Sequence, residues 1–174
     1  GPMPQTTLSP VMDYEALLQE GDADYAFPPL DEYEGAMMCY TSGTTGNPKG
    51  VLYTHRSLYL HSLSSLGPDV LGLRQRDTVM PIVPMFHANS WGFPFTAALA
   101  GSKQVFPSMY MQPQVILDLI RNEEITIGAG VPTIWIGMAQ LLAQSGERLP
   151  SLHTIVCGGS AAPQSLIETY AKWG

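Results

Sequence analysis

From Ala36 onward, short apolar runs alternate with longer amphipathic segments. Runs of four to seven residues that are rich in Val, Ile and Met predict buried strands. The runs are AMMCY at 36–40, TVMPIV at 78–83, KQVF at 103–106, ITIGAG at 125–130 and HTIVCGG at 153–159. The segments between them predict helices, several opened by Thr or Pro and closed by Gly, near residues 55–66, 92–100, 113–122, 133–144 and 163–173. Strands that alternate with helices predict an α/β fold, with a mainly parallel sheet covered by helices.

The first part of the chain has a different pattern. Ser9 followed by Pro10 predicts a helix start, and the apolar positions after it continue until Gly21. An acidic linker that contains Pro28-Pro29 follows. We therefore expect a helix and linker over residues 3–35 and an α/β subdomain over residues 36–174. Residues 1–2 resemble the remnant of a cleaved expression tag.

Composition narrows the function classes. The formal charge is -7, so a broad basic surface for nucleic acid or an anionic membrane is excluded and any phosphate site must be local. No apolar run approaches the roughly 18 residues that span a bilayer, and the start lacks a signal-peptide pattern. Cys39 and Cys157 lie in apolar stretches without metal-type spacing, which predicts buried reduced thiols in a cytoplasmic protein.

The segment that follows AMMCY has the composition of a phosphate cradle. Residues 41–50, TSGTTGNPKG, combine three glycines, four hydroxyls and one lysine. Glycines let backbone amides approach an anion, hydroxyls add donors that can also contact Mg2+, and lysine supplies positive charge. A surface turn is the alternative, because these residue types are common in turns. A Walker A loop does not fit, since Pro48 precedes Lys49 and Gly50 follows it.

Three later loops also follow predicted strands. His87, Asn89 and Trp91 lie within five residues, although a lone His among apolar neighbours is more often structural and Trp91 could belong to the core. The small residues from Gly130 to Thr133 suit close helix packing or the wall of a lipid tunnel equally well. Gly158-Gly159 suits a tight strand-to-helix turn or a seat for a flat ligand.

Together these motifs identify a resemblance. YTSGTTGNPKGV at 40–51 resembles the signature of the adenylate-forming superfamily, which comprises acyl-CoA synthetases, luciferases and peptide-synthetase adenylation domains. PMFH-x-N-x-W at 84–91 is similar to the second motif of medium- and long-chain fatty acyl-CoA synthetases, and GG-x-x-x-P at 158–163 is similar to the adenine-side motif. The resemblance implies that the chain is a subdomain of the large N-terminal domain of these enzymes.

The resemblance also implies roles for individual residues. Lys49 pairs with phosphate, Thr41 helps to bind Mg2+, and His87 lies beside the acyl carboxylate and the α-phosphate, which makes His87 and Lys49 the catalytic candidates. The implied nucleotide-binding residues are Thr41, Ser42, Gly43, Thr44, Thr45, Gly46, Lys49, Gly158, Gly159 and Ser160. The implied acyl-binding or gating residues are His87, Ala88, Asn89, Trp91, Gly130, Val131 and Pro132. His55 and Arg56 are interpreted as structural, because Thr54 can cap the helix that carries them.

The implied reaction joins a fatty acid to coenzyme A in two steps. The carboxylate attacks the α-phosphorus of MgATP to give acyl-AMP and pyrophosphate, and the coenzyme A thiol then displaces AMP. The family's aromatic-Gly-x-Thr-Glu segment, ribose-binding Asp, hinge and C-terminal domain are absent from this sequence, so we expect the isolated chain to be inactive. Family members are often homodimers, which is the expectation for the whole protein. The alternatives are a ligase for an aryl or amino acid, which Trp91 disfavours, and a non-catalytic nucleotide-binding module.

Overall fold

The computed structural model describes residues 5–41 and 46–173, which divide into two compact units, one up to Leu30 and one from Asp31 onward. The first unit contains the helix α1 (Tyr14–Gln19). The predicted helix start at Ser9 is wrong. Asp13 is the N-cap instead, and its side chain accepts a hydrogen bond of 2.9 Å from the amide of Ala16. A carboxylate at this position also complements the partial positive charge of the helix N-terminus, so the helix begins there.

The second unit contains the predicted parallel sheet. Its strands are β3 (Thr78–Pro81), β4 (Lys103–Gln104), β5 (Ile127–Gly130) and β6 (Thr154–Cys157), in the order β4-β3-β5-β6. Val79 of β3 pairs with Gln104 on one side and with Ile127 on the other, while Gly130 of β5 pairs with Cys157 of β6. The α/β prediction is confirmed. The strands are shorter than the apolar runs because the last residues of several runs already turn into the following loops.

The helices lie close to their predicted positions. They are α2 (His55–Ser65), α4 (Phe93–Ala100), α5 (Pro113–Asn122), α6 (Pro132–Ser145) and α7 (Gln164–Trp173). Thr54 caps α2, since its hydroxyl oxygen accepts a 3.1 Å hydrogen bond from the amide of Ser57. Pro113 and Pro132 begin α5 and α6, where a residue without an N–H loses no helical hydrogen bond.

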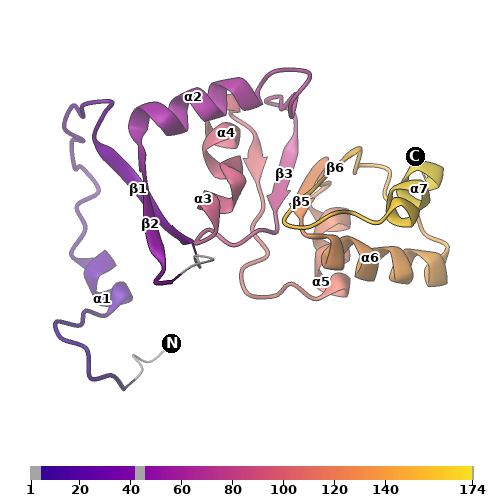
Figure 1. The fold of residues 1–174 in the computed structure, drawn as a ribbon, viewed down its shortest axis with the longest axis horizontal. Coiled ribbons are helices and arrows are strands. Elements are labelled where there is room, and N and C mark those ends of the chain that lie inside the picture. Colours follow the sequence, from indigo (N-terminus) through magenta and orange to yellow (C-terminus); the bar gives the residue numbers. More distant parts are fainter. Residues whose placement is uncertain (1–4, 42–45, 174) are drawn as a thin grey trace. The chain divides into compact units, whose positions relative to one another are not determined.

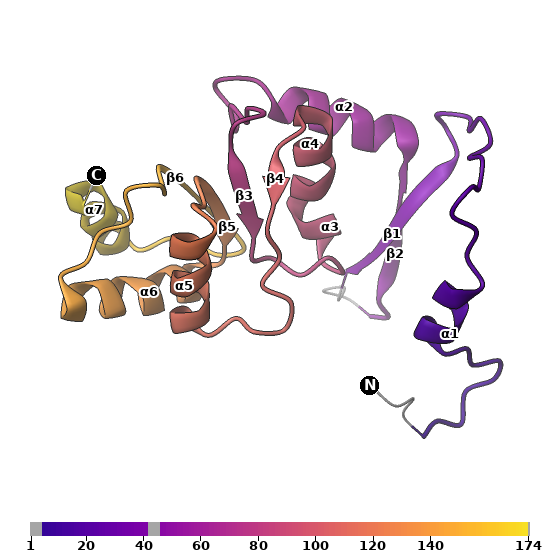
Figure 2. The ribbon, with the colours of Figure 1, turned by 180° about the vertical axis from the view of Figure 1, so that it is seen from behind.

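Helices cover both faces of the parallel sheet. Met80 faces a core that it shares with α5, α6 and α7, whereas its neighbour Val79 faces a second core that it shares with α4. Successive side chains of a strand point to opposite faces, so a continuous apolar run supplies both cores. Figure 1 shows α5, α6 and α7 grouped near β5 and β6, and Figure 2 shows the same grouping from behind.

One predicted strand belongs elsewhere. AMMCY forms part of β1 (Gly35–Thr41), which pairs antiparallel with β2 (Lys49–Thr54) and does not join the parallel sheet. The hairpin is possible because a short connection can join antiparallel strands, whereas a parallel pair needs a long crossover. The strand β2 was not predicted, because its Lys-Gly start reads as the end of the preceding loop.

Candidate functional site

The carboxyl ends of β3, β5 and β6 lie at one edge of the parallel sheet, and the loops that leave them carry predicted site residues. In open α/β sheets this edge is where ligands usually bind. The segment after β3 carries His87 to Trp91, Val131 follows β5, and Gly158 follows β6. The parallel register of Gly130 with Cys157 places the last two loops beside each other.

The Gly/Thr segment joins the two strands of the hairpin. Thr41 at the end of β1 and Lys49 at the start of β2 are register partners, and both side chains are exposed. Ser42, Gly43, Thr44 and Thr45 lie outside the described residues. Gly46 has a φ of 151°, in the region that favours glycine, and an added Cβ there would meet nothing within 4 Å. The hairpin therefore presents a hydroxyl and a cation side by side at the end where its two strands are connected.

The loop after β3 contains an unusual turn. In α3 (Ala88–Trp91) all four residues have positive φ, between 46° and 56°, and Gly92 continues at 74°. Left-handed backbone costs a non-glycine residue roughly 1–2 kcal/mol, and less for Asn, so the surrounding structure must hold this turn. Strained backbone of this kind clusters at functional sites. Apart from Asn89 and Gly92, no residue in this segment is of a type that favours left-handed backbone.

Two side-chain hydrogen bonds hold the turn. The Ser90 hydroxyl donates to the carbonyl of Val83 at 2.5 Å, and the Cys39 thiol donates to Oδ1 of Asn89 at 2.9 Å. Asn89 is 1% exposed and Cys39 is 6% exposed, so the second bond is shielded from water. This bond joins the turn to β1, because Cys39 lies in that strand.

The indole of Trp91, which belongs to the loop after β3, reaches the loop after β6. A Cβ placed on Gly158 would lie 2.9 Å from Cη2 of the Trp91 indole, so the ring lies directly against the glycine backbone. Gly159 has a φ of 83°, and a Cβ there would lie 3.2 Å from Cγ1 of Val131. A flat group does sit against the Gly-Gly turn, and it is Trp91 itself.

The structure shows what Gly130 and its neighbours do locally. The carbonyl of Gly130 accepts hydrogen bonds from the Trp135 indole at 3.2 Å and from the amide of Gly158 at 3.3 Å. The backbone of Gly130 is therefore bonded both to α6 and to the loop after β6. Val131 is 37% exposed at the edge of the sheet, and Pro132 is buried as the first residue of α6.

The remaining predicted residues are less connected. His87 precedes the left-handed turn and is exposed, and Ser160 is exposed beyond the Gly-Gly turn. Within residues 5–41 and 46–173, neither side chain makes a hydrogen bond. Ala88 is half-buried at the start of the turn. The structure thus brings Trp91 and Val131 to the Gly158–Gly159 turn and joins Asn89 to Cys39, while the side chains of His87 and Ser160 are exposed.

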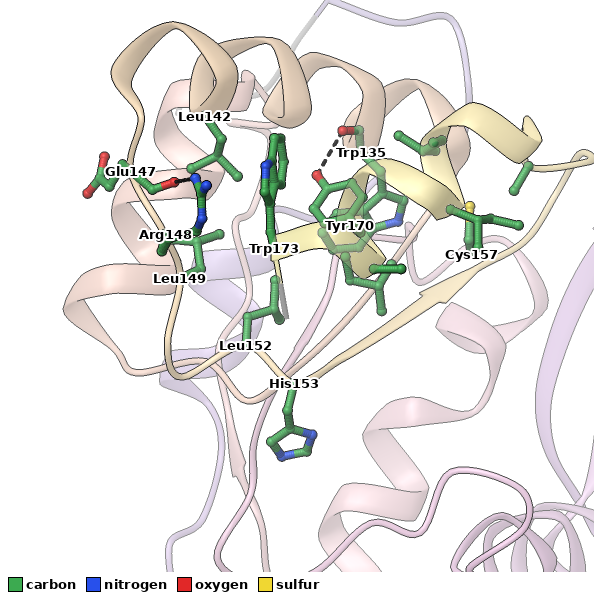
Figure 3. Close-up of a pocket in the computed structure, with 15 residues that line it drawn as sticks. Trp135, Leu142, Glu147, Arg148, Leu149, Leu152, His153, Cys157, Tyr170 and Trp173 are labelled. Atoms are coloured by element: carbon green, nitrogen blue, oxygen red, sulfur yellow. Dashed lines mark hydrogen bonds between the residues drawn. The ribbon is translucent and has the colours of Figure 1, made fainter.

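Sequence reasoning did not anticipate a cavity of about 350 Å³ between α6, β6 and α7 (Figure 3). Trp135 and Tyr170 lie against it at a ring angle of 89°, and the Tyr170 hydroxyl donates to the carbonyl of Trp135 at 2.9 Å. Burial, and then a negative charge on Cys157, raise the pKa of Tyr170 well above its usual range. Cys157 lines this cavity and is partly buried against the core, so it is less buried than predicted, and desolvation raises the pKa of its thiol.

The residues present suit the phosphates of a nucleotide with Mg2+. Thr41 offers a hydroxyl oxygen, a ligand type that Mg2+ accepts, and Lys49 offers an ammonium beside it. Within the described part of the chain no carboxylate pairs with Lys49, whereas Lys103 and Arg56 each pair with a glutamate. The ion pair of Arg56 with Glu32 agrees with the interpretation of Arg56 as a structural residue.

None of the described helices has both the length and the apolar character that a bilayer crossing requires.

Known proteins are similar to this chain in sequence and in fold. Residues 3–174 match the family described as AMP-binding enzyme. The chain is 48% identical over 157 residues to a medium-chain-fatty-acid–CoA ligase of Ectopseudomonas oleovorans, covering 90% of this chain and 29% of that protein. It is 46% identical over 159 residues to a 3-methylmercaptopropionyl-CoA ligase of Ruegeria lacuscaerulensis, covering 91% of this chain and 30% of that one. The chain thus spans less than a third of the length of these relatives.

Solved structures of related enzymes have a similar fold. The inhibitor-bound N-terminal domain of FACL13 from Mycobacterium tuberculosis superposes with a TM-score of 0.79 at 29% identity, covering 91% of this chain and 39% of that one. O-succinylbenzoate coenzyme A synthetase from Bacillus subtilis, in complex with ATP and a magnesium ion, gives 0.79 at 28% identity, covering 94% and 33%. The chain therefore belongs to the AMP-binding enzyme family, and its fold is that found in the N-terminal domain of adenylate-forming enzymes.

Proposed function

We propose that this chain is the ATP- and acyl-binding part of an AMP-forming ligase that joins a fatty acid to coenzyme A. The observation that carries the proposal is the contact of Trp91 with Gly158. It brings the motif expected to bind the acid and the motif expected to bind the nucleotide into one place, at the edge of the sheet where ligands usually bind. The medium-chain relative at 48% identity supports a fatty acid as the substrate.

In this proposal the protein positions its substrates and neutralises charge. Lys49 pairs with phosphate oxygens of ATP, and Thr41 lies where its hydroxyl can reach the accompanying Mg2+. Mg2+, when bound with ATP, offsets the negative charge that the attacking carboxylate must approach. Ser42, Gly43, Thr44, Thr45 and Gly46 supply further phosphate donors, while Gly158, Gly159 and Ser160 flank the adenine.

The acyl side of the site rests on the turn and its neighbours. His87 is exposed at the start of the turn, where its imidazole can meet a substrate carboxylate, and Ala88 and Asn89 shape the loop. Trp91 and Val131 lie at the two ends of the Gly-Gly turn and form an apolar entrance. Apolar lining with few polar groups is typical of sites for small amphipathic acids.

The test is pyrophosphate release by a longer protein that contains this chain, scanned across fatty acids of increasing length, 3-methylmercaptopropionate and benzoate. A profile that peaks on fatty acids supports the proposal. A peak on the thioether acid is the second candidate, because a ligase for that acid is 46% identical to this chain. A profile that peaks on benzoate, or no release with any acid, refutes the fatty-acid assignment.

The chain by itself is expected to bind nucleotide without completing the reaction. We expect it to bind MgATP weakly and to form no acyl-CoA, because it spans less than a third of the length of the ligases that it resembles. Octanoyl-CoA formation above a Lys49→Ala control would contradict this statement. A cytoplasmic location and a homodimeric whole protein stay predictions.

A further inference from the structure

The hairpin that leads to the Gly/Thr segment contacts the turn that carries Trp91 through one buried hydrogen bond. Its donor is the thiol of Cys39 in β1, and its acceptor is Oδ1 of Asn89, at 2.9 Å. The neighbours of Cys39 in β1 face the opposite side, since Met38 is 54% exposed and Tyr40 is 65% exposed. Cys39 is thus the residue of this stretch whose side chain reaches the turn.

The position of Cys39 along the hairpin matters. Thr41, the candidate phosphate and Mg2+ contact, lies two residues further along the same strand, and it is the register partner of Lys49. A ligand that draws Thr41 and Lys49 together acts directly on the end of the hairpin. Because adjacent residues of a strand move together, the same displacement reaches the Cys39 thiol.

The other end of the bond is equally constrained. Asn89 lies inside a turn whose four residues all have φ between 46° and 56°, a conformation that needs outside support. Trp91 lies two residues beyond Asn89, and its indole rests against Gly158. A change in the position of Asn89 therefore changes the position of the indole at the candidate entrance.

We propose that Cys39 is a positioning residue whose thiol holds the left-handed turn and couples nucleotide binding at the hairpin to the position of Trp91. The inference rests on the proposed function, because the ligand that it invokes is ATP. The thiol acts as a hydrogen-bond donor and undergoes no chemical change. A sulfhydryl is a weak donor, but shielding from water strengthens the bond and makes an unpaired Asn89 oxygen unfavourable.

The test uses the chain labelled with 5-fluorotryptophan and observed by fluorine NMR. The sequence contains three tryptophans, and the Trp91→Phe variant assigns the Trp91 resonance. The variants are Cys39→Ala, which removes the donor, and Cys39→Ser, which retains a donor in a smaller side chain. Met38→Ala is the matched control, because it alters the adjacent residue of β1 on the exposed face.

Without ligand, we expect a single sharp Trp91 resonance in the unmodified chain, in Cys39→Ser and in Met38→Ala. In Cys39→Ala we expect this resonance to broaden or split, because the turn is no longer held in one conformation. With MgATP, the Trp91 resonance shifts in the unmodified chain, and Cys39→Ala loses this shift although calorimetry still detects MgATP binding.

Two results overturn the inference. One is a Cys39→Ala spectrum, with and without MgATP, that equals that of the unmodified chain. The other is a Cys39→Ser variant that behaves like Cys39→Ala, which would show that sulfur volume rather than hydrogen bonding matters. If Cys39→Ala does not fold, Asn89→Gly removes the acceptor instead, since glycine adopts the required φ freely, and it is expected to lose the same shift.

Failure of the proposed function has a different signature. In that case calorimetry detects no MgATP binding to any variant, including the unmodified chain. The ligand-free spectra still decide whether the Cys39 thiol holds the turn. A broadened Trp91 resonance in Cys39→Ala would then support the positioning role, while the link to a nucleotide would be refuted.

Discussion

Gly128 in β5 lies against the Trp135 side chain of α6, and the substitution Gly128→Ala tests whether this contact governs how α6 packs on the sheet. A Cβ at Gly128 would lie 2.6 Å from Cη2 of Trp135, whereas ordinary contact begins near 3.4 Å. The indole would have to retreat by about 0.8 Å, which a close-packed interior resists. A shift of the ring also disturbs a hydrogen bond, because Trp135 is fully buried and its indole N–H donates to the carbonyl of Gly130 at 3.2 Å.

The expected loss of stability follows from these contacts. Overpacking costs about 1–3 kcal/mol, and a strained indole hydrogen bond adds about 1 kcal/mol, so we expect Gly128→Ala to lower the free energy of unfolding by about 3 kcal/mol. For a chain of this length, that corresponds to a fall in Tm of roughly 6–12 °C. Urea unfolding followed by circular dichroism measures the free energy, and a thermal scan measures Tm.

Gly50→Ala is the matched control for this prediction. Gly50 also lies in a strand, but a Cβ there would approach the flexible end of Met38 at 3.2 Å. We expect little change in its unfolding free energy. A Trp135→Phe background removes the atom that clashes, so the cost of Gly128→Ala should shrink there, as a double-mutant cycle would reveal. Equal stability of Gly128→Ala and Gly50→Ala would refute the reasoning.

The remaining predictions concern the phosphate contact proposed for Lys49, the buried carboxylate of Asp77 and the partly buried phenol of Tyr170. Lys49→Ala should weaken MgATP binding by roughly 10- to 100-fold in calorimetry, because a charge-assisted phosphate contact is lost. Lys103→Ala should not, because Lys103 lies at the start of β4 and pairs with Glu123. Asp77→Ala should lower the free energy of unfolding by about 1–3 kcal/mol, because Asp77 is 5% exposed and accepts hydrogen bonds from the Arg74 amide and the Thr126 hydroxyl; Asp77→Asn should recover part of the loss. Burial raises the pKa of Tyr170, so stability should fall as pH rises above about 10, where the unfolded chain loses a proton that the folded chain keeps. In Tyr170→Phe that decline should be shallower, and an unchanged decline would contradict the burial argument.

Local sequence patterns predicted much of this fold. The apolar runs identified the strands of the parallel sheet, and Thr54, Pro113 and Pro132 marked helix starts within one residue. These predictions succeed because helix capping and side-chain periodicity depend on residues close in the chain. The same runs could not identify the partners of each strand. AMMCY reads as a buried strand, yet it pairs antiparallel with a segment that the sequence pattern assigned to a loop.

The motifs named the candidate residues, but tertiary structure decided how they meet. The sequence places Asn89 and Trp91 in one loop and Gly158 in another, and no local rule states that the indole lies on the glycine or that Cys39 bonds to Asn89. Four consecutive left-handed residues without glycine also contradict local preference, so they exist because contacts elsewhere hold them. Similarly, the sequence pattern predicts that Cys157 is a buried core residue, but Cys157 lines the cavity between α6 and α7 and is only partly buried. Short-range propensity thus determines the elements, while long-range packing determines strand partners, strained turns and the surroundings of each functional side chain.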